Sequence, residues 1–277
     1  MRIFVLTRNL LLLLAIASPA LLRAQFQKPT DEELKMTADP KAPGAAAVYF
    51  NVEEINNDPL QFHSFYARIK VLQDAGKELA TISIPYESDN ETITDFQGRT
   101  IHADGTVIPF RGKPQILLEP KTTMKKGVQR QINHKVFNLP NVEVGSILEY
   151  RYTLRYEGNL DQFSNLRGRI SSPQWAIQRP YFVHKAHYVF MPMKEFLPRN
   201  QTQPVMSEMA NDHQSTHGIQ LNILKWNLNL PEGANMILTG FDHYVLDVTD
   251  IPPAADINSA QYFVFFHYEN VVSDSKK

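Results

Sequence analysis

The sequence predicts an all-β protein, a sandwich of antiparallel strands joined by long loops. From Ala47 onward, apolar and polar residues alternate with a period of two in nearly every segment, which is typical of half-buried strands. The 18 prolines lie mostly between these segments, where they suit loops and strand edges better than helices. No long segment carries the apolar stripe of an amphipathic helix.

Residues 1–24 have the composition of a secretory signal peptide. Arg2 and Arg8 flank the start of the segment, residues 10–17 are apolar, and Ala24 is a suitable last residue before cleavage. The apolar run is shorter than the roughly 20 residues that span a bilayer, so a membrane anchor is the less favoured interpretation. We therefore expect export to the periplasm or the extracellular space, and no membrane span after cleavage.

Residues 25–46 form a polar lead-in, and the predicted sandwich covers residues 47–268. Within the lead-in, Thr30 and Glu33 have the spacing of a capping box, which predicts one short helix. The strand pattern of residues 62–71 is followed by the turn residues Asp74-Ala75-Gly76 and by a second apolar alternation at residues 80–84, which predicts a hairpin.

A second hairpin is predicted around Asp104-Gly105, because this dipeptide favours the positive φ of a tight turn. Further strands are expected at residues 128–138, 146–157, 181–191, 219–230, 244–248 and 261–268. In the strand 146–157, one face carries Leu148, Tyr150, Tyr152, Leu154 and Tyr156. The strand 261–268 is apolar on both faces, which indicates either a central strand or a docking surface.

Charge and cysteine content exclude several function classes. The signal peptide holds 3 of the 28 basic residues, so 25 remain against 29 acidic ones and the net charge is near −4. This balance lacks the basic patch that nucleic acids or anionic lipids require, so neither is expected as a partner. The chain has no cysteine, which excludes a thiol nucleophile, a CxxC redox centre and a thiolate metal site.

Two histidine pairs could suggest metal binding. His213 and His217 are four residues apart next to Asp212, a spacing that suits two zinc ligands on one helical face. No third ligand is evident, so their role is left open and no metal or cofactor is assigned. His184 and His187 are three residues apart, which separates them on a strand, and His184 shares an apolar side with Phe182, Ala186, Tyr188 and Phe190. We expect a packed, hydrogen-bonded His184.

Motifs for other chemistries are missing or weak. The sequence has no G-x-S-x-G element, and Gly145-Ser146 only begins a strand. Glycine patterns for nucleotide binding are also missing. The candidates for a pair of carboxylates that could hydrolyse glycosides are Glu53, Glu54, Glu149 and Glu157. They are expected mostly on the polar, solvated sides of strands. No catalytic residue is therefore predicted.

Four segments resemble a known family: residues 39–50, 66–86, 93–110 and 137–154. Their most specific parts are RIKVLxxAG, ADGTVIPF and LPNVEVGSILEYRY. They are similar to the bacterial Domain of Unknown Function 3857, an exported module that commonly precedes a transglutaminase-like domain. The resemblance runs from Asp39 to Tyr268 and implies an immunoglobulin-like β-sandwich without an assigned activity.

Catalysis in such proteins is implied to belong to the following domain, with a cysteine, a histidine and an aspartate. Residues 269–277 form a tail where that domain would normally begin, so no catalytic position is carried over. We expect either a free-standing member, a shortened member, or a part of a longer protein that stops where the second domain would begin.

The sequence thus predicts a non-enzymatic exported module that positions or presents substrate to a transglutaminase- or peptidase-like domain or partner protein. Two alternatives stay open. The 11 tyrosines suggest a glycan- or peptide-binding module of the cell envelope, although such rings commonly form a core. A metal-dependent hydrolase that uses His213 and His217 is less favoured. The ligand, the oligomeric state and the strand order are not assigned.

Overall fold

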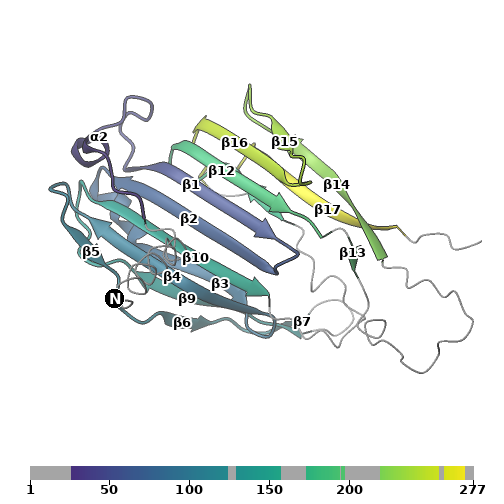
Figure 1. The fold of residues 1–277 in the computed structure, drawn as a ribbon. Helices are drawn as coiled ribbons and strands as arrows, with labels where there is room; N and C mark the ends of the chain where they lie inside the picture. The colour runs from purple at the N-terminus through teal and green to yellow at the C-terminus, as the bar shows by residue number, and fades with distance from the viewer. Residues whose placement is uncertain are drawn as a thin grey trace, which may run out of the picture. The chain divides into compact units, whose positions relative to one another are not determined.

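The computed structural model describes residues 26–123, 129–156, 173–193, 195–196, 219–255 and 259–271 (Figure 1). Residues 31–277 form one compact unit, distinct from residues 1–30. The fold is built almost entirely of strands, which confirms the predicted all-β class. The predicted short helix is α2 (Asp31–Lys35).

The largest sheet has eight strands. Their order is β15 (Met236–Leu238), β16 (Tyr244–Ile251), β12 (Val183–Met191), β1 (Ala47–Asn57), β2 (Phe62–Val71), β10 (Ile147–Tyr156), β4 (Glu91–Ile101) and β5 (Val107–Pro109). β1 and β12 are parallel, with Tyr49 opposite Val183, whereas the other neighbours are antiparallel. The sheet is therefore mixed, and its strand order does not establish an immunoglobulin-like topology.

Three smaller sheets complete the described fold. The first has the order β3 (Thr81–Glu87), β9 (Ile132–Asn138) and β6 (Gln115–Leu118). The second has the order β11 (Gln174–Ala176), β17 (Phe263–Val271), β14 (Ile219–Asn229) and β13 (Glu195–Phe196). The third pairs β7 (Thr122–Thr123) with β8 (Gln129–Arg130).

The main core lies between one face of the large sheet and the smaller sheets. Ile69 of β2 and Leu148 of β10 pack in the same cluster as Ile82 of β3 and Val264 of β17. Each fully buried large aliphatic side chain of this kind contributes about 1.5–3 kcal/mol of transfer free energy. A second, smaller cluster on the other face includes Val48 and Phe50, and Leu34 of α2 packs against it.

A bulge in β1 decides which side chains face the main core. The register of β1 against β2 shifts between Tyr49 and Asn51, so Phe50 is the extra residue. A bulge of this kind reverses the alternation beyond it. Tyr49 lies in the main core before the bulge, and Val52 lies there after it. The acidic side chain of Glu54, two residues further on, therefore faces the core side as well.

The first predicted hairpin is wrong. Residues 74–80 form a 3-10 helix, η1 (Asp74–Ala80), and β3 then pairs with β9 in a different sheet from β2. Gly76 explains the local geometry, because a Cβ there would lie 2.3 Å from the carbonyl oxygen of Ala46. η1 thus packs closely against the residue before β1, and the chain leaves the large sheet before β3 begins.

The other strand predictions are confirmed in outline. β4 and β5 form the hairpin around Asp104-Gly105, where Gly105 has a φ of 86°. In β10, Leu148, Tyr150 and Tyr152 pair with Ile69, Ala67 and Phe65, so the predicted core face is correct. β17 is a central strand between β11 and β14. Within the described residues, no helix has the length and apolar character that crossing a membrane requires.

Candidate functional site

Glu149 is the centre of a buried charge cluster on the face of the large sheet opposite the main core. Its carboxylate is fully buried and lies 2.8 Å from Arg68 and 2.6 Å from Arg99. The Tyr66 hydroxyl donates a hydrogen bond to Oε1 of the same carboxylate at 2.6 Å. Glu33 of α2 contacts Arg68 at 3.1 Å. These contacts tie α2 to the sheet.

The electrostatics of this cluster favour a charged Arg68 and a neutral Tyr66. Burial alone would lower the pKa of Arg68, but the charge and hydrogen bond of Glu149, together with Tyr66 and Glu33, outweigh burial and raise it. Burial raises the pKa of Tyr66, and the hydrogen bond to Glu149 raises it further. The arginine therefore stays charged and the tyrosine stays neutral at physiological pH.

Lys70 makes a second attachment beside this cluster. Its side chain is fully buried, and Nζ donates hydrogen bonds to the carbonyl oxygens of Leu34 at 2.8 Å and Gly145 at 2.7 Å. Burial lowers the pKa of Lys70 to about 8. The lysine thus connects the lead-in segment to the turn before β10.

A different charge cluster lies on the core side of the same sheet. Glu54 is 3.2 Å from Nε2 of His63 and 3.3 Å from Arg179, whose guanidinium lies 5.3 Å from the centre of the Phe65 ring. Nε2 of His63 is close enough to Glu54 for an ion pair, but the two groups do not have the geometry of a hydrogen bond. Burial would raise the pKa of Glu54, but His63 and Arg179 together lower it.

These positions correct the expectation of solvated carboxylates. Glu54 and Glu149 are buried, because the bulge turns Glu54 inward and the lead-in segment contributes Glu33 to the Glu149 cluster. The two carboxylates cannot act as a pair, since their partners Phe65 and Arg68 on β2 face opposite sides of the sheet.

The other two predicted candidates do not supply a catalytic pair either. Glu53 accepts a hydrogen bond from Asn51 at 2.8 Å. Glu157 lies outside the described residues. Both buried carboxylates are matched by cations, so the geometry indicates structural ion pairs rather than a general acid and base.

The histidines have separate partners. His184 contacts Asp39 through Nε2 and packs against the rings of Phe50 and Phe182, as a packed, hydrogen-bonded histidine should. It lies beside the second cluster, which also holds Phe182, so the predicted shared side is correct for Phe182. The prediction is wrong for Ala186, Tyr188 and Phe190, which lie in the main core. His187 bonds Asp247 at 2.7 Å.

His213, His217 and Asp212 lie outside the described residues. Among the residues that are described, no group of three or more potential metal ligands comes together.

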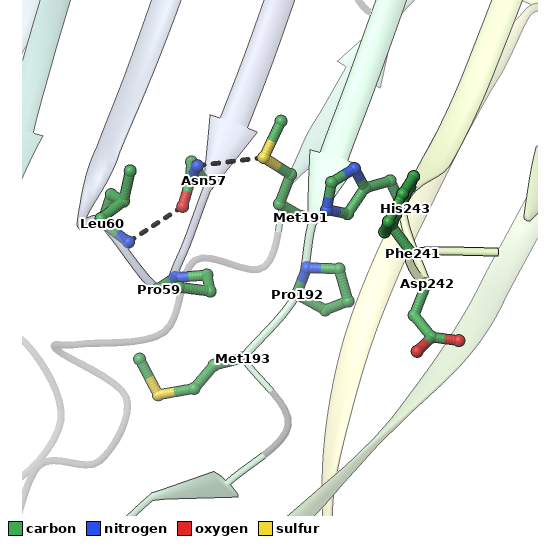
Figure 2. A pocket seen from close by; sticks show the side chains of 9 residues that line it. All are labelled: Asn57, Pro59, Leu60, Met191, Pro192, Met193, Phe241, Asp242 and His243. Carbon is green, nitrogen blue, oxygen red and sulfur yellow. Dashed lines mark hydrogen bonds between the residues drawn. The ribbon is translucent and has the colours of Figure 1, made fainter. Parts of the chain in front are cut away.

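A pocket with both apolar and polar lining residues opens where three chain segments meet at one end of the large sheet (Figure 2). Its volume is about 590 Å³. The lining residues are Asn57, Pro59 and Leu60 after β1, Met191, Pro192 and Met193 at the end of β12, and Phe241, Asp242 and His243 before β16. Sequence reasoning did not find this site, because its residues come from three distant segments.

Polar contacts hold the first two segments together. Asn57 Nδ2 donates to the sulfur of Met191 at 3.0 Å, and Asn57 Oδ1 accepts a hydrogen bond from the backbone N–H of Leu60 at 2.9 Å (Figure 2). The backbone N–H of Asp58 donates to the Met191 carbonyl at 3.0 Å. One asparagine side chain therefore joins the β1–β2 turn to the end of β12.

The third segment is a tight turn that displays an aromatic ring. The backbone N–H of Asp242 donates to Thr239 O at 2.9 Å, and the N–H of Thr239 donates to His243 O at 2.9 Å. Phe241, at the tip, is 84% exposed, and its ring centre is 6.2 Å from that of His243. A large aromatic residue between Gly240 and Asp242 in a turn is the one sequence signal that could have indicated this site.

The pocket chemistry suits an apolar protein side chain. None of its nine lining residues is a lysine or arginine, and Asp242 is acidic, so the lining does not favour a phosphate or a carboxylate. Its two methionines are flexible and adapt to varied apolar partners. Leu60 on the rim is 64% exposed, and Phe241 adds to the exposed apolar area. Exposed apolar clusters on a protein commonly mark contact sites.

Strand β17 runs toward the same end of the large sheet as this pocket. Near its start, the Tyr262 carbonyl accepts a hydrogen bond from Ile177, whose own carbonyl accepts one from Tyr188. Further along, the Phe266 ring lies 4.7 Å from that of Phe190, next to Met191 at the pocket. The strand then continues to Val271.

Comparison with known proteins identifies the family. The family model described as Domain of Unknown Function with solved-structure structure (DUF3857) matches residues 63–229. That range is 167 of the 277 residues, more than half of the chain. The chain belongs to the DUF3857 family. The matched range contains Arg68, Arg99 and Glu149, whereas Glu33 lies before it. Three of the four blocks that carried the resemblance, residues 66–86, 93–110 and 137–154, fall within it.

A solved structure has a fold similar to that of this DUF3857 chain. It is the crystal structure of a protein described as "a putative protease" from Parabacteroides distasonis ATCC 8503, with a TM-score of 0.54 and 12% sequence identity. The match covers 80% of this chain but only 40% of the Parabacteroides chain. At this identity the likeness shows the fold alone. No curated protein matches the sequence.

Proposed function

We propose that this DUF3857 chain is a non-enzymatic exported module that docks to a transglutaminase- or peptidase-like catalytic domain and presents substrate to it. The observation that carries the proposal is the unequal coverage of the structural match. The fold accounts for 80% of this chain and only 40% of a longer chain described as a putative protease. A fold that recurs as one part of a larger protein suits an accessory module.

The pocket supports a protein partner. Methionine, proline, leucine and phenylalanine make up most of its lining, no lysine or arginine is among the nine lining residues, and Phe241 and Leu60 are exposed there. β17 runs toward this end of the sheet, so a domain joined after β17 in a longer relative would stand close to the pocket. We therefore assign the pocket as the contact for an apolar side chain of the catalytic domain.

The absence of cysteine supports a non-catalytic role in a transglutaminase pair, because that chemistry needs a thiolate. The tyrosines that suggested glycan binding include Tyr150, Tyr152 and Tyr188, which pack in or against the main core. They are thus unavailable as a flat stacking platform, and the glycan alternative loses its main support. The immunoglobulin-like arrangement stays part of the proposal and depends on the family resemblance.

Binding to a purified catalytic domain tests the proposal. The full chain is titrated by calorimetry with transglutaminase-like and peptidase-like catalytic domains encoded in the same genome. We expect saturable binding to one of them, and we expect Phe241→Asp to weaken it by about tenfold or more, as loss of an apolar anchor should. Val107→Asp is the matched control, since Val107 is an exposed aliphatic residue on β5, at the opposite edge of the large sheet.

The control distinguishes a site from a general effect of added charge. Equal weakening by Phe241→Asp and Val107→Asp would reject the pocket as the contact. Absence of binding to every such domain, with no change in their activity, would reject the accessory role itself.

Export is tested separately. The N-terminal pattern of residues 1–24 supports cleavage after Ala24. Fractionation of cells that produce the full chain, followed by intact mass measurement, should give an extracytoplasmic protein that begins at Gln25. A cytoplasmic protein with the intact N-terminus would contradict this part of the proposal.

A further inference from the structure

Strand β6 is an edge strand of the three-stranded sheet. Gln115, Ile116, Leu117 and Leu118 pair with Val136, Lys135, His134 and Asn133 of β9. In the part of the chain that the structure describes, no strand pairs with the other side of β6. Backbone groups along such an edge are free to continue the sheet with another strand.

The side chains of β6 make this edge unusually apolar. Ile116 is 54% exposed, Leu117 is 54% exposed and Leu118 is 71% exposed. Because they are consecutive, both faces of the strand present aliphatic side chains to solvent. No charged residue lies within β6, whereas natural edge strands are commonly protected by charges or by proline. Edge strand β5, for comparison, ends in Pro109.

The flanking residues limit how another strand can pair. Pro114 and Pro120 bracket the edge and have no backbone N–H, so the hydrogen bonds of a ladder are confined to the few residues between them, whereas side chains just beyond them can still face the partner strand. Lys113 lies three residues before Ile116, and Glu119 lies three residues after it. An antiparallel pair of two β6 strands centred on Ile116 therefore places each Lys113 opposite the partner's Glu119.

Charge selects this register over its neighbour. Pairing centred on Leu117 would instead place Lys113 opposite the partner's Lys121, a repulsive contact made twice. In the Ile116 register both cross-strand contacts are attractive. Glu119 already lies 3.0 Å from Nε2 of His134 in its own chain, and a carboxylate can accept hydrogen bonds from more than one donor.

We propose that β6 pairs antiparallel with β6 of a second copy of this chain, about a two-fold axis at Ile116. Two three-stranded sheets become one six-stranded sheet, and each aliphatic side chain of β6 is covered in part by the partner subunit. The ladder is short, so the dimer is a weak, concentration-dependent one rather than an obligate assembly. The inference is independent of the pocket and of its proposed partner.

Sedimentation equilibrium of the full chain tests this pairing. Across concentrations from about 1 μM to about 1 mM, we expect a reversible monomer–dimer equilibrium. Leu117→Lys should weaken dimerisation by about tenfold or more, because a charge on an edge strand opposes pairing. Its melting temperature should stay unchanged, since Leu117 is exposed in the monomer. Ile237→Lys is the matched control, because Ile237 is 60% exposed on β15, an edge strand of the eight-stranded sheet.

A charge exchange tests the register. Lys113→Glu and Glu119→Lys should each weaken the dimer, and the double variant should restore it. Failure of the double variant to restore the dimer would overturn the Ile116 register. A protein that stays monomeric over the whole concentration range, or a dimer unaffected by Leu117→Lys, would overturn the proposal.

Discussion

At the scale of single residues, we expect the charge of Glu149 to contribute strongly to the stability of the fold. Its buried carboxylate is shared by Arg68 and Arg99. Glu149→Gln would leave these two guanidinium groups without their common counter-charge. We expect the free energy of unfolding to fall by about 3–5 kcal/mol, the usual cost of breaking a buried ion pair from one side. Urea denaturation at neutral pH measures the difference.

Glu53→Gln is the control for this prediction. Glu53 lies on the adjacent strand β1 and accepts a hydrogen bond from Asn51, which glutamine can also accept. We expect a change within about 0.5 kcal/mol. Similar losses for the two variants would show that Glu149 is not the centre of the cluster.

Lys70 gives the protein a pH dependence of its own. Burial lowers its pKa to about 8 in the folded state, from an ordinary value of 10.5. Between these two pH values the unfolded chain binds a proton that the folded chain has released. Stability therefore rises with pH across this window, with a slope that approaches about 1.4 kcal/mol per pH unit.

Comparison with Lys70→Met isolates this effect. Urea midpoints of the wild-type chain should rise between about pH 8 and about pH 9.5, whereas those of the variant should stay level. A rise of equal size in both proteins would assign the effect to a different group.

At the scale of the strand, β10 shows how an alternating pattern becomes a two-sided element. Tyr150 stacks on Phe65 with ring centres 5.8 Å apart, whereas the next residue, Arg151, donates to Gln97 on the opposite face. We expect Tyr150→Asp to unfold the domain, because a carboxylate would replace a ring packed against the main core. Arg151→Asp should cost about 1 kcal/mol. Thermal unfolding followed by circular dichroism compares them, and an unchanged melting temperature for Tyr150→Asp would refute the face assignment.

Most strands could be predicted from the sequence, because the alternation of apolar and polar residues shows which segments are extended and which side chains face the core. A period of two is a local property, and it located β2, β10, β12, β14 and β16, whereas β17 was located as a short run that is apolar on both faces. The pairing of β3 with β9 instead of β2 was not predictable, because the two strands are distant in the sequence and no local pattern specifies their pairing. The face of the sheet on which Glu54 lies could not be predicted from the sequence either, since one extra residue at the β1 bulge reverses the alternation.

At the scale of the whole molecule, contacts between distant segments decide both the topology and the pocket. The parallel pair of β1 and β12 aligns Tyr49 with Val183, and no local pattern specifies such a partner. The same pairing brings Asn57 within hydrogen-bond distance of Met191. The candidate site could therefore be predicted only after the fold, whereas the absence of a thiol catalyst followed directly from composition.

The tyrosines that pack together in this fold predict a shared response to alkali. Burial raises the pKa of Tyr188 to about 12, and burial also raises the pKa of Tyr150, Tyr152 and Tyr156 above the ordinary value of 10.0. Above pH 10 the unfolded chain loses phenolic protons that the folded chain keeps, so stability falls as pH rises. Because several rings contribute, the fall should exceed about 1.4 kcal/mol per pH unit. Phenolate absorbance and circular dichroism should then change together in one cooperative step. Gradual ionisation of most tyrosines near pH 10 in a folded chain would show that these rings are not buried together.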